Sequence, residues 1–503
     1  MDTKILINAI DPEECRVAKI ADRLLEEFNI ETTAKKITQG NIYKGTIVRI
    51  EPGLQAAFVE YGGARHGFLQ MDEIHKDYFA DVDAGKKTIE KLLKPGQDVI
   101  VQIVKDRIMK KGAALTTFIS LAGRYVVIMP GSNNCSISRK IEDEKERKRL
   151  KDIVKNIKLP KDIGAIIRTA AINYTKTKIE KDIRYLMRIW RDIKAGIKKN
   201  NAPCLLYEES NIALRVIRDS FTDDVSEILI DDSIIFEEIK GFINLISPNH
   251  NKIVKLYTGL KPIFTKYQLE DQIASIYRSR VKLKSGGSIV IAQTEALVAI
   301  DVNSGKAIRK YTVEGTAAQT NLEAAEEIAK QIRIRDLGGL IVIDFIDMRE
   351  KSNKSAVEKE IRKHLKKDKA KTKVGNISMF GLMEMSRQRI RPSIEFGSLV
   401  TCRRCNGKGL VPSKETLGLS FLRRLNLDTL KKQSGVVKCI LPKETALYLL
   451  NKKRKEIIEL EDIRNISINI ECDDTMNCSD FKIVYEELNN LKEEQRTKSD
   501  SGF

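Results

Sequence analysis

Two acidic residues stand at the ends of two apolar runs in the second half of the sequence. ALVAI leads into Asp301 and Asn303, and LIVI leads into Asp344. Apolar runs of this kind are typical of buried strands, where a carboxylate is costly unless it is paired or bound to a cation. Residues two apart share a face of a strand, so on neighbouring strands these three side chains would converge. Such oxygen ligands suit Mg²⁺.

A magnesium ion held in this way could promote attack of water at a phosphorus atom. The alternative is structural, since either aspartate could cap a helix or begin a turn. Asp347 lies three residues after Asp344, so on a continuing strand it would face away, in an outer or structural role. The sequence has no GxxxxGK(S/T) phosphate loop, which argues against nucleotide hydrolysis. The histidines show no ligand spacing: His66, His75, His250 and His364.

Cys402 and Cys405 have the spacing of half a zinc knuckle and are followed by Asn-Gly-Lys-Gly. Zinc needs four ligands, and no second pair follows. A second chain could supply two more thiolates, or the pair could bind no metal. A thioredoxin-like redox pair is a further alternative, although we expect no thioredoxin-type βαβ unit around it. Within one chain the site could instead be completed by Cys439, Cys472 or Cys478.

Residues 38–118 contain short β-rich runs broken by glycine, which predicts a small barrel of the OB type. Alternation along these runs places Phe58 and Phe68 among polar neighbours. An exposed aromatic ring on such a barrel stacks against unpaired bases, which contributes about 1–3 kcal/mol per base. A register shifted by one residue would place the rings in the core instead. Nearby basic residues could contact phosphates: Lys105, Arg107, Lys110 and Lys111.

The elements around the two aspartates alternate between strand and helix over residues 278–350, which indicates an α/β architecture. Thr320 followed by Glu323 resembles a capping box, so the helix is expected to begin there. Its apolar face would contain Leu322, Ala325, Ile328 and Ile332. Helical spacing recurs around 183–193. A chain of 503 residues is too long for one core, so several domains are expected.

The chain is basic, with 89 Lys+Arg against 70 Asp+Glu and a net charge of +19. This favours a polyanionic partner such as nucleic acid. A lysine-rich composition that only keeps the surface soluble is the alternative. No apolar run is long enough to cross a membrane, and no secretory signal is visible, so we expect a cytoplasmic protein.

Several motifs together resemble the ribonuclease E/G family, and they cover the chain from about residue 38 to residue 410. In chain order they are GLQAAFVEYG, RHGFL, KGAALTTFISLAGRY, ALVAIDVNSGK, RDLGGLIVIDFIDM, FGLMEMSRQRIRPS and the CxxCNGKG segment.

The resemblance implies an α/β multidomain fold. An RNase-H-like domain is interrupted by a barrel and a sensor, and a deoxyribonuclease-I-like catalytic domain follows. The implied ranges are the N-terminal RNase-H-like segment 1–37, OB-type RNA-binding barrel 38–118, 5′ sensor 119–214, the returning RNase-H-like segment 215–277, catalytic domain 278–399, zinc link 400–414 and small C-terminal domain 415–503.

The resemblance also implies roles for individual residues. Asp301 and Asp344 would hold magnesium with support from Asn303. The residues that touch RNA would be Phe58, Phe68 and Lys111. The sensor pocket for a 5′-monophosphate would contain Gly123, Val127, Arg168, Thr169 and Lys371. Cys402 and Cys405 would share a structural zinc ion between two chains, giving a homodimer or homotetramer.

The implied activity is magnesium-dependent endonucleolytic cleavage of single-stranded RNA to 5′-phosphate and 3′-hydroxyl ends, in RNA processing, including rRNA maturation, and in mRNA decay. The alternative is a non-catalytic RNA-binding or scaffold protein, which has no need of the aspartate pair. Lys371 stands where the family has an arginine, so the charge is kept but the planar guanidinium group is lost. Arg403 replaces the proline of the family's knuckle. Without the long tail of larger members, the chain is similar to ribonuclease G or to a minimal ribonuclease E core.

Overall fold

The computed structural model forms two compact units, Met1–Ser398 and Leu399–Phe503. It describes residues 2–33, 38–78, 88–105, 112–138, 140–141, 143–157, 159–305, 312–389, 394, 399–431 and 435–486. Lys111, Arg107 and Lys110, considered above as RNA contacts, lie outside the described residues. None of the helices in the described ranges is long and apolar enough to cross a membrane.

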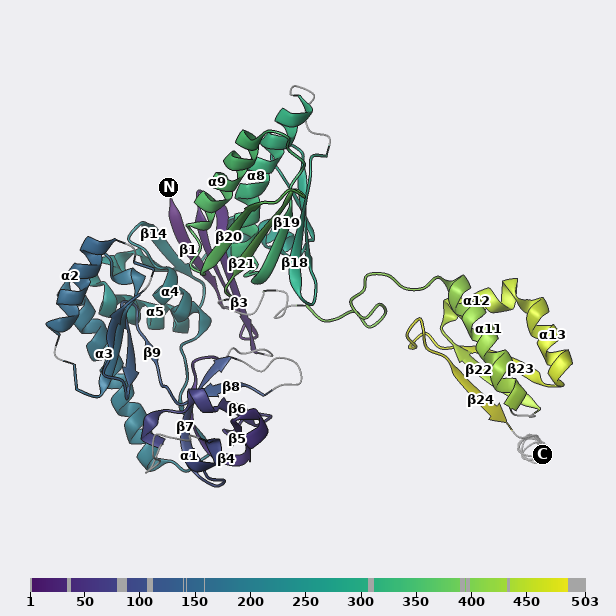
Figure 1. Ribbon diagram of the computed structural model, residues 1–503, viewed down its shortest axis with the longest axis horizontal. Helices are drawn as coiled ribbons and strands as arrows, with labels where there is room; N and C mark the ends of the chain where they lie inside the picture. Colours follow the sequence, from purple (N-terminus) through teal and green to yellow (C-terminus); the bar gives the residue numbers. More distant parts are fainter. Residues whose placement is uncertain are drawn as a thin grey trace. The chain divides into compact units, whose positions relative to one another are not determined.

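The first sheet of the larger unit is built from two segments that are far apart in the sequence. Its order is β15-β14-β1-β2-β3, and β1 pairs parallel with β14 and antiparallel with β2 (Figure 1). The strands are β1 Thr3–Asn8, β2 Glu14–Ala21, β3 Leu24–Thr32, β14 Val225–Ile230 and β15 Val254–Leu256. Residues of the N-terminal segment and of 215–277 therefore share one sheet.

Both faces of this sheet are covered. Ile5 and Ile7 pack in the cluster under α4 (Ile212–Ser220) and α5 (Ser233–Ile246). Leu6 faces the other way, into the cluster that holds Phe264. The second cluster includes residues of α6 (Ile263–Lys266) and α7 (Glu270–Ile276). Burial on both faces explains why the first strand reads as a continuous apolar run.

The barrel contains the strands β4 Ile42–Glu51, β5 Ala56–Glu60, β6 Gly67–Gln70, β7 Asp98–Lys105 and β8 Ala114–Thr116. The strand order β4-β5-β6-β8-β7 is closed by pairing of β7 with β4. A short helix, α1 (Ile89–Leu92), contributes two side chains to the barrel core. A further strand, β13 (Cys204–Tyr207), comes from beyond the expected barrel segment and pairs with the start of β4.

The chain between the barrel and α4 forms a four-stranded sheet with the order β11-β12-β10-β9. These strands are β9 Leu121–Ala122, β10 Val126–Pro130, β11 Cys135–Ile137 and β12 Ile163–Ile167. Helices α2 (Glu144–Lys155) and α3 (Lys176–Lys199) contribute to its core. The helix expected around 183–193 is confirmed as a stretch of α3, which buries Ile183 and Ile193.

The third sheet carries the aspartate pair and has the order β16-β17-β18-β19-β21-β20. Its strands are β16 Arg280–Lys282, β17 Ser288–Gln293, β18 Leu297–Asn303, β19 Gly339–Asp344, β20 Thr372–Ile377 and β21 Leu382–Arg387. Helices α8 (Val313–Ile334) and α9 (Lys351–Leu365) lie side by side on one face of it (Figure 1). The expected alternation of strand and helix in this region is confirmed.

The start of α8 differs from the expectation. The Thr312 hydroxyl accepts the N–H of Gly315 at 3.1 Å and caps the helix. Thr320 is a buried mid-helix residue, and Glu323 instead accepts the Ser285 N–H at 2.8 Å. The predicted capping box is therefore wrong, because the same spacing also places two side chains about one turn apart inside a helix. The apolar face is correct, since Ala325, Ile328 and Ile332 are buried and Leu322 packs against the core.

Within residues 399–431 and 435–486, the smaller unit contains a three-stranded sheet, β23-β22-β24, and three helices. Its elements are α11 Lys414–Lys431, β22 Val436–Leu441, α12 Lys443–Lys452, α13 Arg454–Arg464, β23 Ser467–Cys472 and β24 Lys482–Glu486. β22 and β23 run parallel and are joined by α12 and α13, which makes a βααβ unit. Our expectation that no βαβ unit accompanies the cysteine pair is wrong, because short strands with one buried face give a weak apolar pattern.

Candidate functional site

The two aspartates lie opposite each other on neighbouring parallel strands. The register of β18 and β19 pairs Asp301 with Asp344. The Asn303 Nδ2 atom donates a hydrogen bond to Asp301 Oδ2 at 2.6 Å. The three side chains that the sequence predicted to converge therefore do so. Both aspartates lie on strands, so the helix-cap alternative does not apply.

Alternation along the two strands places these side chains on the open face of the sheet. Ile300 and Val302 on β18 and Ile343 on β19 are buried in the core with α8 and α9. The residues between and after them point the other way, so Asp301 and Asp344 are exposed. The apolar residues thus fix the strands from one side and present the polar residues on the other.

Negative charge is concentrated at this edge of the sheet. Partial burial raises the pKa of Asp344, and the charges of Asp301 and Asp347 raise the pKa further. β19 ends at Asp344, so the continuing strand on which Asp347 was expected to face away does not exist. Asp347 instead lies close enough to raise the pKa of Asp344. The sequence could not show this, because the direction of a side chain beyond a strand end depends on the turn.

The arrangement fits a divalent cation. Two adjacent carboxylates and an amide provide oxygen ligands, and a cation would offset the charge that raises the pKa of Asp344. The described residues contain no group of three or more His, Cys, Asp or Glu side chains that could hold a metal ion, so a cation at Asp301 and Asp344 would need further ligands such as water. Two carboxylates with space for water suit Mg²⁺ better than ions that need a complete protein cage.

On the barrel, Phe58 and Phe68 form a cross-strand pair between β5 and β6. Their ring centroids are 5.8 Å apart with an interplanar angle of 63°. Both rings are half-buried and lie outside the barrel core, to which Ala57 and Val59 contribute. The Arg49 guanidinium lies 4.9 Å from the Phe58 ring centroid. The register assumed from the sequence is therefore correct, and the alternative in which the rings are core is wrong.

In the β9–β12 sheet, Arg168 is held by two partners. Its Nη1 donates to the Gly123 carbonyl at 2.6 Å, and its Nη2 donates to Asp219 Oδ1 at 2.7 Å. Thr169 follows as an exposed residue at the start of a short 3₁₀ helix. Val127 is half-buried on β10, next to β12. The fold thus brings four predicted sensor residues to one end of the sheet.

Asp182 on α3 supports this cluster and was missed from the sequence. Its buried carboxylate accepts three backbone N–H groups, those of Arg124, Tyr125 and Val126. Burial raises the pKa of Asp182, whereas these donors act in the opposite direction. A Cβ atom at Gly123 would lie 2.5 Å from the carboxylate, so this position requires glycine.

Lys371 is an exposed residue just before β20. Two residues earlier, Lys369 Nζ donates to Ser220 Oγ at 2.6 Å and to Glu27 Oε2 at 2.9 Å. Ser220 directly follows Asp219, the partner of Arg168. These contacts bring the loop that carries Lys371 beside the predicted sensor.

The cysteine loop of the smaller unit offers two thiols. Backbone N–H groups of Cys405 and Arg404 point at the sulfur of Cys402 and lower the pKa of that thiol. Donors of this kind favour the thiolate, which is the form that binds zinc. Arg404 Nε also donates to Cys478 Sγ at 2.9 Å. Cys439 is buried in the core, and burial raises its pKa to about 12, which argues against it as a ligand.

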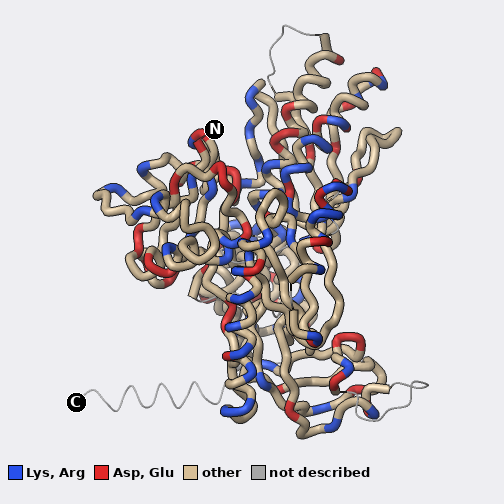
Figure 2. Tube along the Cα trace, turned by 90° about the vertical axis from the view of Figure 1, so that its left-hand side faces the viewer, with Lys and Arg blue, Asp and Glu red and all other residues tan. Residues whose placement is uncertain are grey.

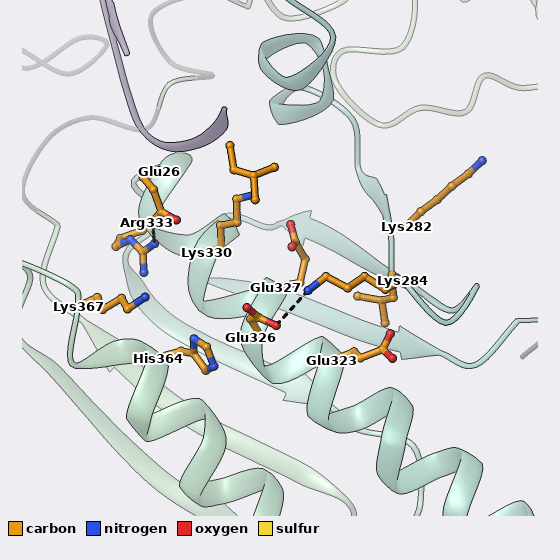
Figure 3. A pocket seen from close by; sticks show the side chains of 12 residues that line it. Glu26, Lys282, Lys284, Glu323, Glu326, Glu327, Lys330, Arg333, His364 and Lys367 are labelled. Atoms are coloured by element: carbon orange, nitrogen blue, oxygen red, sulfur yellow. Dashed lines mark hydrogen bonds and ion pairs between the residues drawn. The ribbon is translucent and has the colours of Figure 1, made fainter. Parts of the chain in front are cut away.

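A hollow lies where the first sheet meets the helices of the third (Figure 3). Arg333 Nη2 on α8 contacts Glu26 Oε2 on β3 at 2.8 Å, and Lys284 Nζ contacts Glu326 Oε2 at 3.6 Å. Acidic and basic side chains alternate around it, so neither sign of charge dominates. The Arg333–Glu26 pair joins α8, and hence the aspartate sheet, to the first sheet, whereas Lys284–Glu326 joins α8 to the loop that follows β16.

Comparison with known proteins identifies three family models along the chain. A model described as the ribonuclease E/G family matches residues 120–390. An S1 RNA binding domain matches residues 36–117, which agrees with the closed barrel. A thioredoxin-like domain of RNase E/G matches residues 401–487, which agrees with the βααβ unit.

Individual relatives are similar over most of the chain. Ribonuclease E of Haemophilus influenzae is 45% identical over 97% of this chain and 53% of the relative. Ribonuclease E of Escherichia coli is 46% identical over 91% of this chain and 43% of the relative. Ribonuclease G of Escherichia coli is 38% identical over 84% of this chain and 88% of the relative. The chain thus spans about half the length of these two ribonuclease E relatives.

Proposed function

Because the chain belongs to the ribonuclease E/G family, we propose that it is a magnesium-dependent endoribonuclease that cleaves single-stranded RNA in the cytoplasm. The products are 5′-phosphate and 3′-hydroxyl ends, and the roles are RNA processing, including rRNA maturation, and mRNA decay. The observation that carries the proposal is the in-register pair of Asp301 and Asp344 on the open face of the third sheet. A non-catalytic RNA-binding or scaffold protein, the alternative, leaves this pair without a role.

The two aspartates hold the metal, and Asn303 orients the Asp301 carboxylate through its 2.6 Å hydrogen bond. When bound, Mg²⁺ supplies positive charge and Lewis acidity at the reacting phosphodiester. Asp347 adds negative charge next to the pair and so favours retention of the cation. The open face of the sheet leaves space for an extended RNA strand above these side chains.

The barrel binds the single-stranded RNA. Phe58 and Phe68 offer two half-exposed rings for unpaired bases, and Arg49 adds a cation beside the first ring. Lys111 is assigned a phosphate contact from the family resemblance. Lys and Arg are distributed over many elements of the chain (Figure 2), and the excess of positive charge attracts RNA from solution.

A 5′-monophosphate is bound at the Arg168 cluster. Gly123 and Asp219 hold the guanidinium in place, and the Thr169 hydroxyl lies next to it in the chain. A positioned guanidinium and a hydroxyl together form a specific phosphate clamp. Val127 and Lys371 complete the pocket in this proposal, with Lys371 brought near by the Lys369 contacts.

The cysteine loop supplies half of a structural zinc site. Cys402 and Cys405 from each of two chains give the four thiolates that a closed tetrahedral site requires. This produces a homodimer, or a homotetramer if dimers pair.

Two kinds of variant, one that should lose cleavage and one that should lose binding, test the catalytic proposal. Asp301→Asn or Asp344→Asn should reduce Mg²⁺-dependent cleavage of a short, unstructured, 5′-monophosphorylated RNA to background, while RNA binding stays close to wild type. Phe58→Ala should weaken binding by about 1–3 kcal/mol and leave folding unchanged. Cleavage is followed on gels and binding by fluorescence anisotropy.

Glu295→Gln is the matched control, since Glu295 is an exposed acid in the turn at the opposite end of the same sheet. It should behave as wild type in both assays. Near-wild-type cleavage by both aspartate variants would rule out the metal assignment. A large loss of thermal stability in Phe58→Ala would show that the ring acts in the fold rather than in binding.

A further inference from the structure

The turn between β20 and β21 presents two large apolar side chains to solvent. Met379 is 87% exposed and Phe380 is 75% exposed. Phe380 opens the FGLMEM segment and Met379 directly precedes it, and the proposed function has so far given neither residue a role. Water-exposed apolar residues of this size are informative when they lie together next to a reactive site, because they mark surfaces that a ligand covers.

The turn is held in a defined conformation by its own hydrogen bonds. The Ser378 N–H donates to the Leu382 carbonyl at 2.8 Å, and the Gly381 N–H donates to the Ser378 carbonyl at 3.2 Å. The Ser378 hydroxyl accepts the Phe380 N–H at 3.2 Å. Gly381 has φ +79°, which glycine adopts without strain. The two side chains therefore project from a pre-organised turn, residues 378–381, which is called the tip below.

The tip lies at the same edge of the sheet as the aspartate pair. β21 runs antiparallel to β19, and Leu382 is the register partner of Asp344. Neighbouring strands are about 5 Å apart, so the turn begins one strand spacing from the carboxylate. A Cβ atom at Gly381 would lie 3.1 Å from Asp347 Oδ1, which places the turn beside the third acid as well.

We propose that Phe380, supported by Met379, stacks against an unpaired nucleobase next to the scissile phosphate and thereby positions that phosphate at Asp301 and Asp344. This inference rests on the proposed function. In single-stranded RNA, the apolar surface closest to a phosphate is the face of an adjacent base, which an exposed aromatic ring binds with little regard to sequence. Two side chains are too small for a stable protein interface, which buries about 800 Å² per partner.

The test uses one RNA with a single defined cleavage site and two derivatives in which the nucleotide on either side of that site is abasic. Phe380→Ala removes the ring, and Phe380→Tyr keeps it. Leu260→Ala is the control, since Leu260 is a fully exposed apolar residue elsewhere on the larger unit. The full chain is used throughout, and kcat, KM and sedimentation are measured for each variant.

Phe380→Ala should lower kcat/KM on the intact RNA by about 5- to 100-fold, whereas Phe380→Tyr and Leu260→Ala should remain near wild type. On one abasic RNA, wild type and Phe380→Ala should become equal, because the base that the ring contacts is absent. That equality identifies the stacked position and distinguishes stacking from a structural effect.

Three results would overturn the inference. Phe380→Ala could cleave intact RNA as fast as wild type, or its deficit could persist undiminished on both abasic RNAs. It could also change sedimentation without changing cleavage, which would make the tip a protein contact. If wild type itself fails to cleave in Mg²⁺, the proposed function has failed, and that outcome is distinct from an active enzyme that is insensitive to Phe380.

Discussion

Arg168 is held in one orientation by the protein itself, as the proposed role in phosphate binding requires. Two of its N–H groups are already bound, one to a backbone carbonyl and one to Asp219. These bonds fix the plane of the guanidinium, so little rotamer freedom remains to be lost when a phosphate binds. The opposite charge on Asp219 also pairs the partly buried arginine.

Arg168→Ala should reduce the preference for 5′-monophosphorylated over 5′-hydroxyl RNA, because only the terminal phosphate distinguishes the two substrates. The measurement is the ratio of kcat/KM for the two RNAs. Cleavage of the 5′-hydroxyl RNA should change little. Arg191→Ala, which removes an exposed arginine of α3, should keep the wild-type ratio. If wild type shows no preference, the sensor is inactive in this chain, and the loop lysine Lys371 becomes the first position to restore to arginine.

At the scale of single residues, the sequence predicted which side chains lie together where local rules apply. The convergence of Asp301, Asn303 and Asp344 follows from a period of two on strands that end together. Asp182 and Asp219 could not be found in this way, since the groups of the predicted sensor that they bind lie more than 50 residues away in the chain. An isolated acid on a helix gives no local signal of the backbone groups that it will bind.

Helix α3 illustrates how one element supports a site that it does not itself form. Its Asp182 satisfies three N–H groups in the turn that leads into β10, and that turn includes the carbonyl that receives Arg168. The remainder of its buried face is apolar, with Ile179, Ile183 and Leu186 in the core. The helix therefore couples packing of this domain to the shape of the predicted phosphate pocket.

Asp182→Ala should lower the free energy of unfolding by roughly 2–4 kcal/mol, because three buried donors lose their acceptor. The free energy of unfolding of Asp182→Asn should lie between those of Asp182→Ala and wild type, since asparagine retains one acceptor oxygen. Urea unfolding measures the change, and Asp192→Ala, on the exposed face of the same helix, is the control. A change of less than about 0.5 kcal/mol in Asp182→Ala would contradict this role, as such values are typical of surface substitutions.

Elements were predicted unevenly from the sequence, for physical reasons. Strong amphipathic periodicity predicted α3, and continuous apolar runs predicted β18 and β19. The start of α8 was misplaced because Thr312 and Thr320 are both followed by helix-compatible residues, and only the tertiary environment buries the second. The edge strand β13 and the βααβ unit were missed because short, half-buried strands carry little pattern.

The whole molecule depends on the cysteine loop for assembly in our proposal. Cys402→Ser should shift the protein from a dimer or larger assembly toward monomer, and activity should fall indirectly. Chelator or acid should have the same effect on wild type, because thiolates must stay deprotonated to bind zinc. Cys135→Ser, which removes an exposed thiol in the larger unit, should leave assembly unchanged.

Mass measurement with metal analysis separates the two ways of completing the site. One zinc per two chains supports a shared centre. One zinc per monomeric chain would instead mean that the site is completed internally, and Cys478, already in contact with Arg404, would be the first residue to substitute.

The order of strands in the first sheet has a consequence for synthesis of the chain. β1 is made well before its parallel partner β14, which begins only at Val225, opposite Thr3. The barrel and the β9–β12 sheet draw all their strands from residues 42–207, so each can complete its hydrogen bonding while the ribosome is still translating. Throughout that interval the nascent β1–β3 hairpins keep one edge open and two apolar faces uncovered. A chain released before Val225 therefore holds a finished S1-type barrel attached to an unfinished, aggregation-prone sheet.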